Sequence, residues 1–252
     1  MGKTDQIETS MKIFGIGLSR TGTTSLSKAL NILGFESRHF IPELFVNQDK
    51  IFDNLSFEPQ IKLNFYWSRI RKSEIEFLQA KGLEVFNSCQ AFGDLPIPLF
   101  YKELDKVFPG SKFIYTFRDI DKWLVSMKWL LSDGQVLWKA GFVNEEIRYA
   151  MYGTCHYDEE RLRTAYWNHH NDVMEYFKDR PEDLLTINID ERRIDFASLC
   201  SFLSLPVIDQ PFPKTNQSTN VTIWNKIDYW LSRKNIIYSL ARKIWKRVRL
   251  IY

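Results

Sequence analysis

One stretch near the N-terminus decides the fold: Gly15-Ile16-Gly17-Leu18-Ser19-Arg20-Thr21-Gly22-Thr23-Thr24-Ser25. A short apolar run over residues 12–18 leads into it, and residues 23–33 follow with leucines along one helical face. Strand, glycine-bearing turn and helix in this order form the context of a phosphate-binding loop. Backbone N–H groups of such a turn point inward, and the helix N-terminus adds partial positive charge. The stretch therefore predicts an anion site.

The loop ends differently from the nucleotide loop of P-loop NTPases. That loop carries Lys and then Ser or Thr after its last glycine, whereas Gly22 is followed by Thr23 and Thr24. The cation is instead Arg20, two residues before Gly22. We expect the loop to bind a phosphate without the usual lysine on a γ-phosphate. The alternative is a plain glycine turn with a helix cap at Thr21 or Thr23.

Composition indicates a large globular chain. It has 252 residues, of which 44% are hydrophobic and 26% charged. Three widely spaced cysteines without a CxxC pair argue against a disulfide framework or a zinc site. Residues 1–10 are polar, lack the apolar core of a signal peptide and read as a flexible leader. No run is long enough to span a membrane, and we expect a cytoplasmic protein.

Basic charge gathers at the C-terminus. Residues 221–252 hold eight lysines and arginines and one acid, so the body before them is mildly acidic. This distribution does not favour nucleic-acid binding. From residue 235 onward, apolar positions recur at helical spacing with basic residues mostly on the other side. Such a helix over 235–252 either makes a peripheral membrane contact or docks on the body through its apolar stripe.

Between leader and tail, residues 11–220 alternate strands and helices. Strands are expected over 12–18, 36–40, 83–87, 112–117 and 184–189, and helices over 23–33, 97–107, 122–131, 159–177 and 196–203. The pattern predicts an α/β three-layer sandwich with a mostly parallel central sheet, P-loop NTPase-like, with helical insertions. The aromatic-rich residues 41–80 are either a partial cover over the site or the core of an irregular insertion.

A second anion site is expected at the end of another strand. Ligands of such sheets bind beyond the carboxyl ends of the strands, where the glycine loop, residues 88–94 and Arg118 all fall. Arg118 offers a fork to phosphate oxygens, and Ser126 lies eight residues on, in the following helix. The alternative is a local ion pair of Arg118 with Asp119. Two phosphate sites imply a ligand with two separated phosphates.

These motifs resemble the sulfotransferases that use PAPS, 3′-phosphoadenosine 5′-phosphosulfate. Their loop reads Pro-Lys-Ser-Gly-Thr-Thr, matched here by residues 19–24, and their 3′-phosphate site is an Arg with a Ser eight residues later, matched by Arg118 and Ser126. The chain is most similar to a short subgroup with Gly-Leu-x-Arg-Thr-Gly-Thr-Thr-Ser-Leu loops, over residues 11–216. The resemblance implies PAPS as donor, PAP as product and no metal.

The resemblance also implies roles for single residues. Arg20 would neutralise the 5′-phosphate and the bridging oxygen. The 5′-phosphate would be held by the rest of the loop, which comprises Thr21, Gly22, Thr23, Thr24 and Ser25. Arg118 and Ser126 would hold the 3′-phosphate. Ser25 stands where an aromatic often stacks on adenine, and the Arg-Lys-Gly motif near the C-terminus of cytosolic members is missing. Lys214 is a candidate to replace part of that motif.

A base is needed for the acceptor, a small molecule with a hydroxyl or an amine. Many cytosolic members use the His of a His-Leu-Pro turn, and this chain has Asp94-Leu95-Pro96 at the comparable place. Asp94 is therefore either the catalytic base or a residue that caps the next helix or positions the acceptor. His170 is the fallback base. Two other functions remain open: a P-loop kinase or NTPase, and a catalytically silent, membrane-peripheral binding protein.

Overall fold

The structure, a computed structural model, describes residues 11–41, 83–131, 148–191 and 195–215. The leader, most of the insertion over 41–80 and the basic tail lie outside the described residues. The chain divides into two compact units, Met1–Asp119 with Asn168–Thr215, and Ile120–Trp167 with Asn216–Tyr252. The sheet belongs to the first unit. A single domain over residues 11–220 stays a prediction.

The first unit is built on a five-stranded parallel sheet, as the sequence predicts. The strands run in the order β2-β3-β1-β4-β5 and every neighbouring pair is parallel. They are β1 (Ile13–Gly15), β2 (Ser37–His39), β3 (Ala91–Gly93), β4 (Lys112–Phe117) and β5 (Leu184–Asn188). Because all strands are parallel, their carboxyl ends meet at one edge of the sheet.

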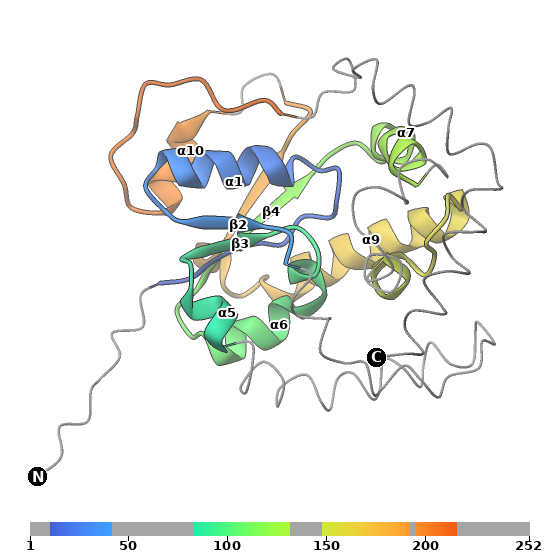
Figure 1. Cartoon of the computed structure of the whole chain (residues 1–252), viewed down its shortest axis with the longest axis horizontal. Coiled ribbons are helices and arrows are strands. Elements are labelled where there is room, and N and C mark those ends of the chain that lie inside the picture. The colour runs from blue at the N-terminus through green and yellow to red at the C-terminus, as the bar shows by residue number, and fades with distance from the viewer. Residues whose placement is uncertain (1–10, 42–82, 132–147, 192–194, 216–252) are drawn as a thin grey trace, which may run out of the picture. The chain divides into compact units, whose positions relative to one another are not determined.

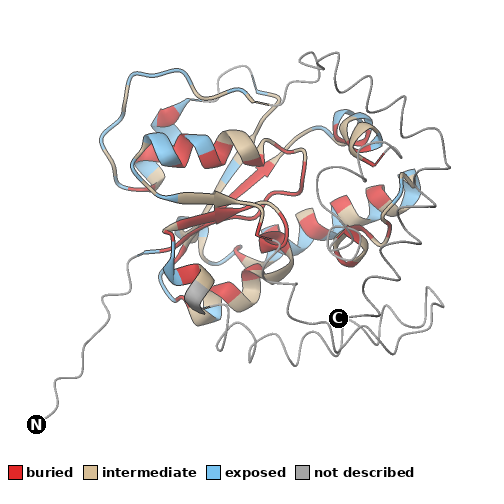
Figure 2. Ribbon diagram, in the orientation of Figure 1, coloured by how far each residue is buried: buried red, intermediate tan, exposed pale blue. Residues whose placement is uncertain are grey.

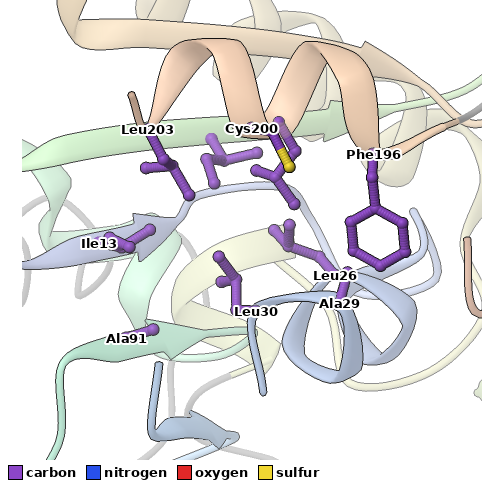
Figure 3. Close-up of a cluster of buried hydrophobic side chains, with 10 residues drawn as sticks. Ile13, Leu26, Ala29, Leu30, Ala91, Phe196, Cys200 and Leu203 are labelled. Atoms are coloured by element: carbon purple, nitrogen blue, oxygen red, sulfur yellow. The ribbon is translucent and has the colours of Figure 1, made fainter. Parts of the chain in front are cut away.

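Helices cover both faces of this sheet. On one face, α1 (Thr23–Ile32) and α10 (Phe196–Phe202) pack on small and aliphatic side chains (Figures 1 and 3). This cluster is fully buried and comprises Ile13, Leu26, Ala29, Leu30, Ala91, Ile114, Phe196, Leu199, Cys200 and Leu203. Burial of this apolar surface fixes α1, and with it the loop before it, on the sheet.

The opposite face is aromatic. Phe14, Phe92 and Phe113 are register partners on three adjacent strands, so their rings line one face. α5 (Leu83–Asn87) and α6 (Ile97–Val107) lie over them (Figure 1). Phe86 of α5 places its ring centroid 5.9 Å from that of Phe14 and 4.9 Å from that of Phe92. The three central strands, β3, β1 and β4, are almost entirely buried, whereas β2 and β5 are not (Figure 2).

This arrangement makes a topological switch point between β1 and β3. The helix that follows β1 is α1, on the aliphatic face, whereas the helix that follows β3 is α6, on the aromatic face. Ligands of open α/β sheets bind where neighbouring strands send their connections to opposite faces. The turns after β1 and β3 are therefore the expected place for a site.

One predicted strand is wrong. Residues 83–87 form helix α5, and the strand β3 is Ala91–Gly93, inside the stretch predicted as a loop. Residues 83–86 resemble a strand in sequence because apolar and polar residues alternate at their start. In the structure they are helical, and the Phe86 ring packs on the aromatic face of the sheet against Phe14 and Phe108. β3 escapes detection because two of its three residues are small, Ala91 and Gly93.

The other described elements match the prediction closely. α6 has the predicted bounds, and α9 (Glu159–Tyr176) ends one residue early. Gly34 ends α1 as expected, with φ +93° and a bond from the Phe35 N–H to the Leu30 carbonyl. β5 was expected to be buried but is only half-buried, because it is an edge strand. In the second unit, the ring of Trp123 on α7 (Ile120–Leu130) packs on those of Tyr152 and Tyr166.

The glycine loop rests directly on β4. A Cβ on Gly17 would lie 2.1 Å from the Thr116 hydroxyl and 2.5 Å from the Thr116 carbonyl oxygen. The Thr21 hydroxyl donates to the Leu18 carbonyl at 2.6 Å and lies 3.0 Å from the Thr116 hydroxyl. Because the Thr21 hydrogen points to Leu18, Thr116 donates to Thr21. Only glycine at position 17 allows this contact.

A buried histidine holds the loop from the other side. His169 of α9 donates from Nε2 to the Ile16 carbonyl at 2.8 Å. Burial lowers the pKa of His169 to about 4, and the bond to Ile16 opposes this shift in part. The folded protein therefore keeps His169 neutral at physiological pH. The Ile16 carbonyl, at the start of the loop, is thus bonded to α9, and this bond requires a hydrogen on Nε2 of His169.

Replacing Gly17 with alanine should destabilise the protein, because the loop could no longer lie against Thr116 of β4. The added methyl group meets backbone as well as side-chain atoms of β4, so the free energy of unfolding should fall by at least about 2 kcal/mol. Gly93→Ala is the matched control, because its Cβ would meet only atoms at 3.8 Å. Urea denaturation of both variants measures the difference, and equal stability would show that the loop is not seated on Thr116.

Acid should destabilise the protein through His169. The unfolded chain takes up a proton near pH 6.5 and the folded protein only near pH 4. Between these values the unfolded state binds more protons, so stability falls as pH falls, by on the order of 3 kcal/mol. His169→Gln keeps an N–H donor but cannot take up this proton, so its stability curve should be flatter over pH 6.5–4. Urea denaturation against pH tests this, with the exposed His156→Gln as control.

Candidate functional site

Helix α1 begins at the glycine turn without a side-chain cap. Its N-cap is Gly22, with φ +87°, and the Leu26 N–H donates to the Gly22 carbonyl at 3.0 Å. The cap expected at Thr21 or Thr23 under the alternative interpretation is therefore wrong. A Cβ on Gly22 would meet Ile189 Cγ2 at 3.0 Å, so the turn also sits tightly against the segment after β5. The helix N-terminus faces the loop with its partial positive charge.

Arg20 is held in an uncommon backbone conformation at the centre of the loop. Its φ of +71° lies in the left-handed region that non-glycine residues rarely adopt. Burial lowers the pKa of the Arg20 guanidinium, the charge of Arg118 lowers it further, and the charge of Asp94 raises it. The Arg20 guanidinium therefore lies close enough to Arg118 and Asp94 to feel both charges. Two half-buried cations in such proximity favour an anion between them.

Arg118 follows β4 and is anchored by the neighbouring strand. Its Nη2 donates to Asp190 Oδ1 at 3.3 Å, and the Asp119 N–H donates to the other carboxylate oxygen at 2.7 Å. Asp190 follows β5, and its own N–H donates to the Asn188 side chain at 3.1 Å. Arg118 is thus paired with Asp190, which orients the guanidinium from a neighbouring strand end.

Asp94 directly follows β3 and faces the loop. It accepts a hydrogen bond from the Ser19 hydroxyl at 2.8 Å, which joins the turns after β1 and β3 at the topological switch point. Its other carboxylate oxygen lies 3.2 Å from His39 Nε2. Asp94 has φ +61°, the same uncommon conformation as Arg20. The corrected position of β3 thus places Asp94 at a strand end, beside the glycine loop.

His39 is a site residue that sequence reasoning missed. It is the last residue of β2, and its Nε2 lies 3.0 Å from the Thr23 hydroxyl and 3.2 Å from the Thr24 hydroxyl, besides its contact with Asp94. A signal was available, since His39 lies in a predicted strand whose carboxyl end must share the edge of the loop. His39 thus joins the phosphate loop to Asp94.

The remaining predicted residues take several positions. Thr21 is buried and its hydroxyl is engaged with Leu18 and Thr116, so it holds the loop rather than a ligand. The Ser25 hydroxyl lies 3.0 Å from that of Thr215 and accepts from its N–H at 3.2 Å. This bond brings the segment containing Lys214, which is exposed, to the first turn of α1.

Ser126 and His170 belong to other surroundings. Ser126 lies half-buried in α7, which is part of the second compact unit, whereas Arg118 belongs to the first. Their use of one phosphate stays a prediction. His170, the fallback base, lies on α9 with Nδ1 3.1 Å from the Tyr115 hydroxyl, and burial lowers its pKa.

The described residues contain no group of three or more His, Cys, Asp or Glu side chains arranged to hold a metal ion. Nor does the described part include a helix that is both long and apolar enough to cross a membrane. The three cysteines are free thiols.

Comparison with known proteins gives one family. The model of the sulfotransferase domain matches residues 12–221. The chain is 23% identical over 264 residues to Ava biosynthesis cluster protein M of Aspergillus versicolor, covering 93% of this chain and 92% of that protein.

Two solved structures are similar at lower identity. A sulfotransferase from Alicyclobacillus acidocaldarius matches with a TM-score of 0.44 at 18% identity, over 87% of this chain and 92% of that one. The sulfotransferase STF9 from Mycobacterium avium matches with a TM-score of 0.44 at 16% identity, over 90% and 69%. Since the family model covers most of the sequence, from β1 to beyond the last described residue, the chain belongs to the sulfotransferase domain family.

Proposed function

We propose that this protein is a PAPS-dependent sulfotransferase that moves a sulfuryl group to a hydroxyl or amine of a small molecule. One observation carries the proposal: the glycine loop that bears Arg20 follows β1 and lies against Thr116 of the neighbouring strand β4, and Arg118 directly follows β4, so both cations lie at the same edge of the sheet. A nucleotide with a phosphate at each end of its ribose is a ligand that would use both cations.

The loop suits the 5′ end of such a donor. The helix N-terminus and the hydroxyls of Thr23 and Thr24 can donate to phosphate oxygens, while Arg20 neutralises charge on the bridging oxygen. Arg118, oriented by Asp190, would hold the 3′-phosphate together with Ser126. These residues therefore fit the donor, although Thr21 has a structural role in the seat of the loop.

The bound donor supplies an activated sulfuryl group, and the protein positions it for in-line transfer. Charge develops on the bridging oxygen as the sulfur–oxygen bond breaks, and a preorganised cation at that position stabilises it. Arg20 is preorganised by its backbone conformation and by the Asp94 charge. No metal is expected, because a sulfuryl group carries less charge than a γ-phosphoryl group.

Two other functions compete with this proposal. A P-loop kinase or NTPase would need the lysine and the Mg²⁺ ligands of that class, and the loop has Arg20 and threonines instead. A catalytically silent protein would bind the nucleotide without turnover. Contact of residues 235–252 with a membrane surface also stays a proposal, and those residues lie outside the described part.

PAP should stabilise the protein against heat and ATP should not. At a concentration 100 times its Kd, a ligand that binds only the folded state adds about 2.7 kcal/mol of stability. Thermal melts with PAP, and with ATP plus Mg²⁺, measure this directly. A shift with ATP and Mg²⁺ alone would favour the kinase, and tight PAP binding without transfer to any acceptor would favour the silent protein.

Arg118→Ala should weaken PAP binding by about tenfold or more, since a charge-assisted bidentate contact is lost. Adenosine 5′-monophosphate lacks the 3′-phosphate, so its affinity should change little. Asp190→Asn should also weaken PAP binding more than binding of adenosine 5′-monophosphate, because the Arg118 side chain is no longer oriented. The loss of PAP affinity should be smaller than in Arg118→Ala. Titration calorimetry measures both ligands, with the exposed Lys178→Ala as charge control. Equal losses for the two nucleotides would remove Arg118 from the 3′-phosphate site.

A further inference from the structure

Three strand-end turns converge on one imidazole. His39 ends β2, Thr23 and Thr24 follow the turn after β1, and Asp94 follows β3. A single atom, His39 Nε2, lies 3.0 Å from the Thr23 hydroxyl, 3.2 Å from the Thr24 hydroxyl and 3.2 Å from Asp94 Oδ2. Under the proposed function, these hydroxyls hold the end of the donor that carries the sulfuryl group. The Nε2 edge of the imidazole is thus beside the hydroxyls expected to hold that end of the donor.

The neighbours of His39 determine where its proton lies. An ionised carboxylate only accepts hydrogen bonds, so the nitrogen that faces Asp94 must carry hydrogen. In the neutral ring, the hydrogen is then on Nε2 and the lone pair is on Nδ1. With the hydrogen on Nε2, this nitrogen cannot accept a hydrogen bond from the Thr23 and Thr24 hydroxyls that lie beside it. His39 therefore has a basic nitrogen that Asp94 does not engage.

Asp94 is poorly placed to be the base itself. Oδ1 accepts from the Ser19 hydroxyl at 2.8 Å and Oδ2 from His39. The backbone is fixed as well: the Phe40 N–H donates to the Gly93 carbonyl at 2.9 Å, so the residues flanking His39 and Asp94 are tied together. Phe40 and Asp94 both adopt positive φ, +65° and +61°. Such strain persists where the surrounding structure demands it, often at functional sites.

We propose that His39 is the catalytic base of the transfer and that Asp94 is its positioning residue. This inference rests on the proposed function. As the acceptor oxygen bonds to sulfur, its O–H bond breaks and the proton passes to Nδ1. The sulfur–oxygen bond to the 5′-phosphate breaks, and its electron pair stays on that phosphate oxygen as PAP leaves. The imidazolium so formed is stabilised by Asp94 at the Nε2 hydrogen, which follows the logic of a histidine–carboxylate pair.

A glutamine at position 39 separates the two functions of the imidazole. Its amide N–H₂ reaches the place of Nε2 and keeps the donor to Asp94 and the threonines, but it has no basic nitrogen. Transfer to water, followed as PAP and sulfate released from PAPS, needs no knowledge of the acceptor. His39→Gln should lower this rate by about 100-fold or more, while the affinity for PAP stays within about twofold of wild type.

Two further variants complete the test. His39→Ala should lose the rate equally, and added imidazole should restore part of it, which a structural role would not allow. Asp94→Asn keeps the shape but loses the charge, so we expect a smaller loss of rate than in His39→Gln. The exposed His156→Ala is the matched control and should behave as wild type.

The outcomes distinguish a failure of the proposed function from a failure of the role proposed for His39. Wild-type protein that neither binds PAP nor releases sulfate contradicts the proposed function. Wild-type turnover with an active His39→Gln variant overturns only the role of His39 as base. A loss of PAP affinity that equals the loss of rate in His39→Gln would make His39 a donor ligand instead. Full activity in His39→Ala with an inactive Asp94→Asn would return the role of base to Asp94.

Discussion

The contact of Gly17 with Thr116 sets the geometry of the whole site. Because residue 17 has no side chain, the loop lies against the backbone of β4. Arg118 directly follows the same strand, so the loop and the second cation are placed by one element. The bond from His169 to Ile16 fixes the loop from α9 as well. The proximity of Arg20 and Arg118 therefore follows from packing and needs no bound ligand to draw them together.

Each cation is balanced by a carboxylate from a different strand end. Asp94, which follows β3, lies near Arg20, and Asp190, which follows β5, pairs with Arg118. Two guanidinium groups in a half-buried site repel each other by an amount that grows as the effective dielectric falls. The acids reduce this repulsion. Under the proposed function, a phosphate that binds between the cations relieves the remainder.

The sequence predicts the local parts of this site well and the long-range parts poorly. The loop and Arg118 were identifiable because glycine spacing and a strand end are local signals, and Asp94 was identifiable from the resemblance of Asp94-Leu95-Pro96 to a family turn. β3 was misplaced because Ala91-Phe92-Gly93 is short and rich in small residues, while its strand character comes from pairing on both sides. His169, Thr116 and Asp190 each contribute through contacts more than 70 residues apart in the sequence, and no local pattern marks them.

His39 shows how pairing register converts a strand residue into a site residue. His39 pairs with Gly93, and Gly93 pairs with Gly15, so the last residues of β2, β3 and β1 lie in one row across the sheet. The turns that follow begin at the same level, which brings Asp94, the phosphate loop and the imidazole together. A slip of one residue in β2 would turn His39 to the opposite face. The catalytic pair we propose is thus a consequence of parallel register. The neighbours of His39 in this row, Gly93 and Gly15, have no side chains.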